Sequence, residues 1–414
     1  MSRVAVHYED LLVGELAEAR GAVFFEYSPT FIASRHELSP FRLPLGPGLK
    51  TRETPPGLRL PGLFEDSLPD AWGRRVMLEW FRRQGIPEHA VTPLRMLAYV
   101  GERAMGALRY TPALDIPAPA ELDLATLCAA AAEAERGGEI DLAVLARAGS
   151  SAGGARPKAL VHLAPDHDHN SAADTASSAP PWFGPNPPPG YTPWLVKFDL
   201  GPVPLLGALE EAFARLARAA GIEVPPTRLL VTTDADGRPR RHFAVRRFDR
   251  EIAPDGARRR IHHHTLAALL HMSAGDLDYQ TFLRATRQLT RDEREVWRAY
   301  RRAVFNVLAG NRDDHAKNHG FLYRDRAWTL GPAYDLTPLS PQQLPERGMA
   351  VCGERRAAGP AHLRKLAEGE GLDRKRALAL IDEVAAALRQ WPALAAEAGV
   401  PERAARDVAA SFGV

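Results

Sequence analysis

Residues 311–323 read NRDDHAKNHGFLY and place two acids, two histidines, a lysine and two asparagines between an apolar helical run and an apolar strand-like run. Polar groups are costly between core elements, so this cluster needs a chemical reason. Asp313 is followed five residues later by Asn318. In protein kinases an aspartate that accepts the hydroxyl proton and an asparagine that holds Mg²⁺ have this spacing on one loop. The same pair also occurs in ordinary turns rich in Asn and Asp, so it is a hypothesis that needs context.

Three further features follow the order in which a kinase uses them. SSAGGARPK (150–158) is a Gly-rich turn whose backbone N–H groups can cradle phosphates, and Lys197 lies in the strand-like WLVKF, where a buried ammonium needs an anionic partner. Asp335 comes seventeen residues after Asn318, where a kinase places its second metal ligand. A plain Gly-Gly turn and a snorkelling surface lysine are the alternatives for the separate pieces. The conjunction carries the kinase hypothesis.

On this hypothesis each residue has a role. Lys197 neutralises the α- and β-phosphates of ATP, Asn318 and Asp335 hold Mg²⁺, and Asp313 positions and deprotonates the acceptor hydroxyl. Adenine contacts are expected at the end of the AVRRFDR strand, residues 246–248. The residues predicted to bind ATP are Ala152, Gly153, Gly154, Ala155, Arg156, Pro157, Lys158, Lys197, Arg246, Arg247, Phe248, His315, Lys317, Asn318, Tyr334 and Asp335.

Composition limits the class of protein. The 414 residues are 45% hydrophobic, enough for a sizeable core, and 53 Lys+Arg balance 51 Asp+Glu, which does not mark a strongly basic nucleic-acid binder. Cys128 and Cys352 are the only cysteines, so we expect no disulfide framework and no thiolate metal site. The opening MSRVAVHYEDLLVGEL lacks an apolar signal core, and no apolar run is long enough to span a bilayer. We therefore expect a cytoplasmic protein without a membrane partner.

The order of predicted elements indicates the fold. Short alternating runs and one clear helical stretch from Asp66 through Phe81 come first, then an Ala/Leu/Glu helix. A Gly-rich turn, a strand, a Pro/Ser-rich stretch, the lysine strand, a helix and a hairpin follow, and the chain is mainly helical from about residue 262. We predict an α+β, two-lobed, protein-kinase-like fold with an N-terminal β-rich subdomain and an all-helical C-lobe. The predicted parts are an N-terminal subdomain 1–112, a helical connector 113–147, a kinase N-lobe 148–250 with a mobile loop at about 165–190, and a helical C-lobe 251–414.

The combined motifs resemble the HipA family of serine/threonine kinase toxins from bacterial type II toxin–antitoxin systems, over nearly the whole chain. In place of the His-x-Glu-Asp found after the hinge in many relatives, this chain has RIHHHTLAALLH (260–271). The motifs that carry the resemblance are SSAGGARPK (150–158), WLVKF (194–198), AVRRFDR (244–250), DDHAKN (313–318), AYDLTP (333–338) and, in the N-terminal part, VGEL (13–16), FFEYSPTFIAS (24–34), LFEDSLPDAWGR (63–74) and VGERAMGAL (100–108).

The resemblance implies partners and regulation. The N-terminal subdomain would join in binding a helix-turn-helix antitoxin (HipB-like), and DNA would be contacted indirectly through that complex. The enzyme would use ATP and Mg²⁺ to phosphorylate a protein, in known relatives an aminoacyl-tRNA synthetase, and so arrest growth and favour persistence. Autophosphorylation of the Gly-rich loop serine falls on Ser151, with Ser150 adjacent. The added negative charge there would repel the phosphates of ATP.

Other hypotheses stay open at this point. His315 either contacts ATP or braces its loop, and Lys317 either reaches the γ-phosphate or faces water. A small-molecule kinase would use the same loop, and a catalytically silent member would act as a DNA-binding co-repressor. A metal-dependent phosphohydrolase would need a His/Asp cluster, but the spacing fits no ligand motif, and we favour a helix start with exposed histidines. The residues that such a cluster would use are His262, His263, His264, His271, Asp313, Asp314, His315 and His319.

Overall fold

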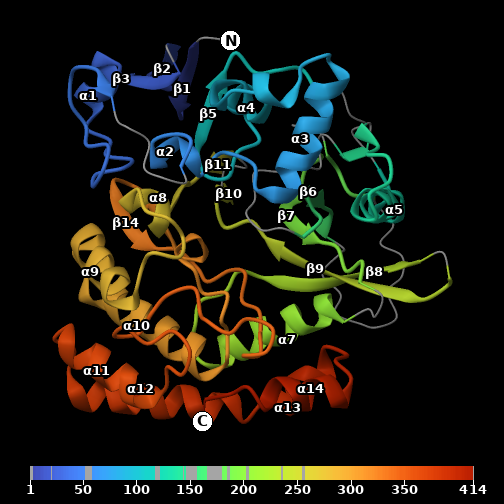
Figure 1. The fold of residues 1–414 in the computed structure, drawn as a ribbon, viewed down its shortest axis with the longest axis vertical. Coiled ribbons are helices and arrows are strands. Elements are labelled where there is room, and N and C mark those ends of the chain that lie inside the picture. Colours follow the sequence, from blue (N-terminus) through green and yellow to red (C-terminus); the bar gives the residue numbers. More distant parts are fainter. Residues whose placement is uncertain are drawn as a thin grey trace.

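The protein is described by a computed structural model in which three regions follow one another (Figure 1). An N-terminal unit of sheet and helices is followed by a four-stranded sheet with one long helix, the N-lobe, and by a mainly helical C-lobe. None of the described helices is long and apolar enough to cross a membrane. The described residues are 3–19, 21–51, 58–116, 122–142, 144–145, 156–165, 180–183, 187–201, 205–234, 236–253 and 257–413.

The N-terminal unit is a five-stranded antiparallel sheet in the order β4-β3-β2-β1-β5. Its strands alternate between buried and exposed side chains, which is why they read as short alternating runs. The helix predicted from Asp66 begins later, at Ala71, because the Asp70 carboxylate caps it by accepting from the Gly73 N–H at 3.0 Å. The elements are β1 (Arg3–Tyr8), β2 (Leu11–Ala19), β3 (Ala22–Tyr27), α1 (Pro29–Ser34), β4 (Lys50–Thr51), α2 (Gly62–Glu65), α3 (Ala71–Arg83), η1 (Glu88–Ala90), α4 (Pro93–Val100) and β5 (Leu108–Thr111).

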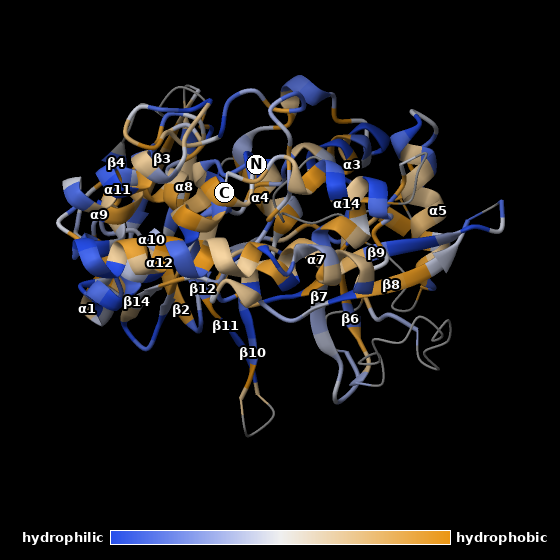
Figure 2. Cartoon of the chain, turned by 90° about the horizontal axis from the view of Figure 1, so that it is seen from below, coloured by the Kyte–Doolittle hydropathy of each residue, from blue (hydrophilic) through white to orange (hydrophobic). Residues whose placement is uncertain are grey.

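The N-lobe sheet has the order β6-β7-β9-β8 and is antiparallel throughout. The predicted hairpin around DADGRP is confirmed by the pairing of Thr233 with Pro239, and Figure 2 shows the hydrophilic start of β9 beside the apolar β8. Most of the predicted mobile loop lies outside the described residues, but Trp182 within it pairs with His162 in an antiparallel bridge. The elements are the connecting helix α5 (Leu124–Glu135), then β6 (Lys158–Leu163), β7 (Thr192–Lys197), α7 (Leu206–Ala219), β8 (Thr227–Thr233) and β9 (Pro239–Arg246).

The C-lobe is mainly helical but not wholly so. Besides the β10–β11 hairpin, it contains a three-stranded sheet in the order β12-β13-β14, which corrects the expectation of an all-helical lobe. This sheet forms because the apolar run that follows the opening motif pairs back onto residues 262–265. The elements are β10 (Arg250–Ile252), β11 (Arg258–Arg260), β12 (His262–Thr265), α8 (Leu266–Leu270), α9 (Tyr279–Thr290), α10 (Glu293–Leu308), η3 (Ala316–Asn318), β13 (Gly320–Arg324), β14 (Ala327–Leu330), α11 (Pro360–Gly369), α12 (Arg374–Leu388), α13 (Trp391–Glu397) and α14 (Glu402–Ala409).

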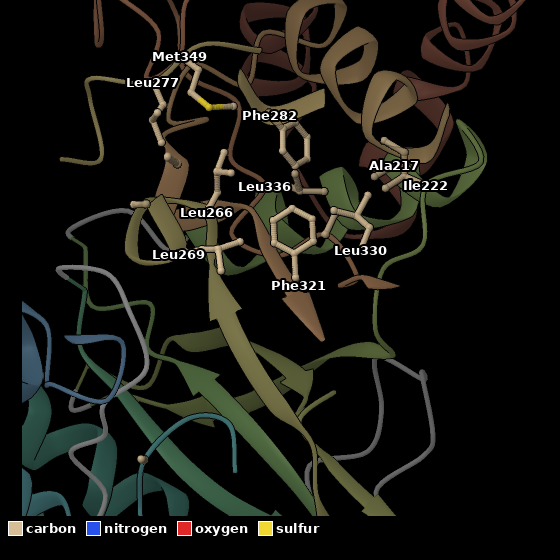
Figure 3. Packing of buried hydrophobic residues seen from close by; sticks show 14 of the residues in the cluster. Ala217, Ile222, Leu266, Leu269, Leu277, Phe282, Phe321, Leu330, Leu336 and Met349 are labelled. Carbon is tan, nitrogen blue, oxygen red and sulfur yellow. The ribbon is translucent and has the colours of Figure 1, made fainter. Parts of the chain in front are cut away.

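The apolar core of the C-lobe packs next to the polar loop at residues 311–318. Figure 3 shows Phe321 of β13 beside Leu330 of β14 and Leu336, with Leu266 and Phe282 close by. Phe321 and Phe282 are fully buried. The polar residues of the opening motif and the segment around Asp335 are therefore anchored at both ends in packed apolar side chains, which fixes the loops that carry them.

Candidate active site

Lys197, the last residue of β7, is the centre of the site. Its Nζ donates to Glu210 Oε2 at 2.7 Å and also contacts Asp335 Oδ1. The Lys197 side chain is 7% exposed, so its charge is almost fully removed from water. Burial by itself lowers the pKa of Lys197, but the carboxylates of Asp335 and Glu210 outweigh burial and raise it. The buried ammonium predicted to need an anion has two.

Glu210 was missed by the sequence reasoning. It lies on α7, is 2% exposed, and its second carboxylate oxygen contacts the guanidinium of Arg156. A lysine on a strand paired with a glutamate on the following helix is the ion pair that active protein kinases require. The signal was present: LEEAFARL puts two acids into an amphipathic helix directly after the lysine strand, and both Glu210 and Glu211 are buried.

The loop before η3 carries Asp313 and Asn318. The Asn318 side-chain Nδ2 donates to the backbone oxygen of Asp313 at 2.8 Å, which ties the two predicted residues together and orients the amide oxygen of Asn318 as the group left for a cation. His315 Nε2 lies 3.6 Å from Asp313 Oδ1. The Asp313 side chain is 45% exposed, so it is accessible to a substrate hydroxyl.

Asp314, beside the predicted base, fixes this loop. Its carboxylate is fully buried and accepts hydrogen bonds from Tyr279 Oη at 2.7 Å, Arg347 Nη1 at 2.8 Å and the Gly348 N–H at 2.8 Å. The sequence reasoning considered Asp314 only as a metal ligand. These hydrogen bonds indicate that Asp314 anchors the loop. Of the two adjacent acids, Asp314 is therefore buried, and Asp313 remains accessible.

Asp335 has a left-handed backbone conformation with φ of 55°. Burial by itself raises the pKa of Asp335, but the Lys197 ammonium more than offsets this, and the pKa is lowered. For Asp313, burial raises the pKa, His315 opposes that shift, and the Asp335 carboxylate adds to it. The environment thus shifts the pKa values of the two carboxyls in opposite directions, as the different roles predicted for them require.

In the predicted adenine-binding segment, residues 246–248, several polar groups already have hydrogen-bond partners within the protein. The amides of Arg246 and Arg247 donate to the carbonyls of Pro226 at 2.8 Å and Pro193 at 2.9 Å. The Arg247 guanidinium is buried against Asp249 at 2.7 Å. The backbone N–H groups of both residues and the Arg247 guanidinium therefore already have partners within the protein.

Aromatic rings join this segment to the segment around Asp335, which is predicted to bind the metal ion. The Phe248 ring stacks on the Tyr334 ring, with centroids 5.6 Å apart and an interplanar angle of 25°. Tyr334 Oη also donates to the backbone oxygen of Lys317 at 2.7 Å. Lys317 is exposed, which is compatible both with a contact to the γ-phosphate and with a side chain that faces water.

Lys158, another residue predicted to bind ATP, contacts a residue outside the N-lobe. Its Nζ donates to Asp70 Oδ2 at 2.7 Å, while Trp72 Nε1 donates to the Lys158 backbone oxygen at 3.2 Å. The N-terminus of α3 is thereby fixed to the start of β6. Pro157 accepts from the Phe198 N–H at 2.9 Å within the same sheet. The remaining predicted loop residues, Ser150, Ser151, Ala152, Gly153, Gly154 and Ala155, lie outside the described residues.

The histidines expected to be exposed at a helix start are buried in β12, which corrects that expectation. His264 lies between Asp66 at 2.7 Å and Ser39 Oγ at 3.0 Å, and His262 donates to the Leu38 carbonyl at 2.9 Å. These contacts join β12 to the N-terminal unit. In the part of the chain that is described, no group of three His, Cys, Asp or Glu side chains could hold a metal ion. All eight residues that a metal-dependent phosphohydrolase would use lie in that part, and they form no such group.

Oxygen ligands are nevertheless available for one hard cation. Asp335 supplies a carboxylate and Asn318 an amide oxygen, the ligand types that Mg²⁺ accepts together with water and phosphate oxygens. The donor set fits Mg²⁺ bound jointly with a nucleotide better than a site made of protein groups alone.

Fold and site together define a protein-kinase-like architecture, with a strand lysine paired to a helix glutamate above a loop that carries an aspartate and an asparagine. The chain belongs to the HipA family. The HipA N-terminal domain matches residues 4–111, and the HipA-like C-terminal domain matches residues 150–391. The resemblance inferred from the motifs is confirmed.

Known proteins agree with this assignment to different extents. A HipA of Shewanella oneidensis, solved in complex with HipB and operator DNA, has a TM-score of 0.66 and 18% identity, with 99% of this chain and 94% of that chain covered. This confirms the predicted HipA-like fold.

Two Sinorhizobium fredii proteins with a provisional kinase designation, Y4mE and Y4dM, are 32% and 29% identical. The matches cover 34% and 36% of this chain and 35% and 38% of those proteins. The chain therefore matches little more than a third of the length of these relatives.

Proposed function

We propose that this protein is a toxin-type serine/threonine protein kinase that transfers the γ-phosphate of ATP to a hydroxyl of a cellular protein. The observation that carries the proposal is the double contact of Lys197 with Glu210 and Asp335. In this arrangement the cation proposed to bind phosphate contacts the carboxylate proposed to bind the metal ion, and phosphoryl transfer requires both groups in place.

The residues divide the chemistry between them. Asp313 accepts the proton of the incoming hydroxyl, and its raised pKa makes it a better base than an ordinary aspartate. Asn318 and Asp335 hold Mg²⁺, and Lys197 holds the phosphates. When bound, Mg·ATP supplies the phosphoryl group and the positive charge that offsets its oxygens. Asp314 keeps the loop in register while the proton moves.

Regulation is proposed through the Gly-rich segment. Phosphorylation of Ser151, seven residues before Lys158, or of the adjacent Ser150, would place about two negative charges beside the cations that hold ATP. The product would repel the phosphates of the next nucleotide, so the enzyme would silence itself.

The partners are proposed from the family. A helix-turn-helix antitoxin of HipB type would neutralise the kinase, as the Shewanella oneidensis HipA is seen with HipB and operator DNA. DNA would then be contacted through the antitoxin. The proposed protein substrate is an aminoacyl-tRNA synthetase, whose phosphorylation would stop aminoacylation.

The test is autophosphorylation of the purified chain with Mg·ATP, mapped by mass spectrometry, beside Asp313→Ala. Phosphate on Ser150 or Ser151 in the wild type and at least about a 100-fold lower rate in the variant is expected. Equal phosphorylation of both proteins would remove Asp313 from the mechanism. Nucleotide binding without phosphate on either protein, also in the presence of synthetase, would favour the silent co-repressor.

A further inference from the structure

A polar cavity lies between the turn that follows α7 and two helices of the C-lobe, and it shares no lining residue with the candidate active site. It has a volume of about 320 Å³ and is formed by the turn after α7 together with α10 and α12. Five arginines line it against two glutamates, and apolar groups such as Trp297 and Leu380 complete the wall. The volume is at the low end for small-molecule sites, which are about 300–1,000 Å³.

Arg302 gives this cavity a buried cation. The residue is 3% exposed, and its Nη2 donates to the Gly331 carbonyl at 2.6 Å. Its Nε and Nη1 are buried and have no hydrogen-bond partner. Burial, with the neighbouring Arg298, lowers the pKa of Arg302 to about 10, so the guanidinium is still charged at neutral pH. Buried charged groups without partners are rare because each costs free energy, so these two donors point to an acceptor that is brought in.

The glutamates do not neutralise the cavity. Glu223 pairs with Arg298, and Glu383 pairs with Arg301 at 2.8 Å. No carboxylate within the described part of the chain forms an ion pair with Arg302. The guanidinium of Arg376 lies 4.1 Å from the centre of the Trp297 ring, a stack that leaves its N–H edges available. Beyond the lining, Asp292 pairs with Arg294, and Glu295 pairs with Arg298, so the positive charge that no described ion pair offsets is that of Arg302 and Arg376.

The spacing of the arginines is a property of the sequence. Arg294, Arg298, Arg301 and Arg302 follow at i, i+4, i+7 and i+8 along α10, so they share one face of the helix. Like charges on one face repel each other and destabilise an isolated helix. An anion that binds several guanidinium groups at once would remove this repulsion, and the planar fork of arginine matches phosphate oxygens.

We propose that this cavity binds a phosphate group, either free or carried by a small organic body, on Arg302, Arg301 and Arg376. Arg302 supplies the two buried donors, and the two other arginines close over the anion from α10 and α12. The apolar wall formed by Trp297 and Leu380 would take up a small organic body. This proposal does not rest on the kinase activity of the protein.

The test measures binding of inorganic phosphate and of phenyl phosphate to the full chain by calorimetry, against chloride at matched ionic strength. Wild type and Arg374→Gln, an exposed arginine of α12 outside the cavity, should bind within about twofold of each other. Arg301→Gln/Arg376→Gln should bind at least about tenfold more weakly, since two charge-assisted contacts are lost. Arg302→Gln should do the same, and the double variant keeps the test valid if Arg302→Gln does not fold.

The outcomes separate the sources of the phosphate group. Phenyl phosphate binding more tightly than inorganic phosphate would assign the site to an organic phosphate, and equal affinities would assign it to the free ion. No binding by wild type, or equal binding by wild type and the double variant, would overturn the proposal. Phosphate held at the candidate active site contributes equally to all four proteins, so the difference between them reports on this cavity alone.

Discussion

Lys158 and Lys197 occupy directly opposed positions in the β6–β7 ladder, and both are buried, but their pKa values are shifted in opposite directions. Burial lowers the pKa of Lys158, and the Asp70 carboxylate, with a smaller contribution from Asp335, does not fully offset it. For Lys197 the carboxylates of Asp335 and Glu210 together outweigh burial. The two lysines differ in the acids that contact them: Lys158 forms an ion pair with Asp70, and Lys197 forms ion pairs with both Glu210 and Asp335.

The difference teaches what makes a buried cation suitable for phosphate binding. Removal from water costs several kcal/mol per ion, and one carboxylate rarely offsets it. Lys197 is held cationic by two acids from different elements, α7 and the segment after β14, so it is ready for a polyanion. Lys158 joins the N-terminal unit to the N-lobe through Asp70, whose own pKa is raised by burial. The contacts of Lys197 fit the proposed phosphate binding, and the Lys158–Asp70 pair joins two units of the fold.

The largest effect is expected for Lys197→Met. The variant loses the cation between two buried carboxylates, so autophosphorylation with Mg·ATP should fall by about 100- to 1,000-fold. Initial rates measured with radiolabelled ATP check this. Lys365→Met, an exposed lysine on α11, is the matched control and should keep the wild-type rate. A Lys197→Met rate near wild type would show that the two lysines do not differ in the way described.

Asp70→Asn should act mainly on stability. Asparagine keeps the cap of α3 but removes the negative charge beside buried Lys158, so the free energy of unfolding in urea should fall by about 3 kcal/mol. Asp115→Asn, an exposed aspartate just after that unit, should change it by less than about 0.5 kcal/mol. Adding Lys158→Met to Asp70→Asn should restore part of the loss, since no buried charge then lacks its partner. Additive losses would contradict the pairing.

His262 extends the comparison to a buried group whose hydrogen bond goes to a backbone carbonyl and not to a carboxylate. Burial lowers the pKa of His262 to about 3, against 6.5 when unfolded. Its contribution to stability is complete above pH 6.5 and is lost as the pH falls towards 3, because only the unfolded chain takes up the proton. Between pH 7 and pH 5 this amounts to about 2 kcal/mol.

The measurement is the free energy of unfolding as a function of pH for wild type and His262→Gln, which keeps an N–H donor for Leu38. The unfolding free energy of the variant should depend less steeply on pH, by the amount that corresponds to one proton taken up on unfolding. The remaining slope comes in part from His162 and His242, whose pKa values burial lowers to about 4. Parallel curves for the two proteins would show that His262 is not neutral in the folded state.

The smallest effect is expected for Phe248→Ala. Loss of the stack on Tyr334 loosens the join between the predicted adenine-binding segment and the metal-binding segment, so nucleotide affinity should fall about 3- to 10-fold. Fluorescence titration with Mg·ADP measures it. Phe412→Ala, which loses a contact with Trp391 far along the chain, should leave the affinity unchanged. A loss at Lys197 but none at Phe248 would restrict recognition of the nucleotide to its phosphates.

Local patterns predicted much of the fold. The strand of Lys197, the hairpin around DADGRP and the helix LEEAFARLARAAGI appear where alternation and helical periodicity indicated them. The prediction that the histidines at 262–264 are exposed was wrong, because three successive histidines show no periodicity that indicates which side chains are buried. Their burial depends on Ser39, Leu38 and Asp66, which are more than 190 residues away. Position in the sequence says nothing about such partners.

The sequence by itself determined the order of the chemical groups: a lysine on a strand, an aspartate and an asparagine five residues apart, and a second aspartate later in the chain. It also determined membership in the HipA family, since motifs in that order occur along both matched domains. Only the tertiary structure decided that Glu210 completes the lysine site and that Asp314 is an anchor while Asp313 stays accessible. The reason is physical: residue type and spacing fix which groups can react, but burial and the charges brought from distant elements fix their protonation state and their exposure.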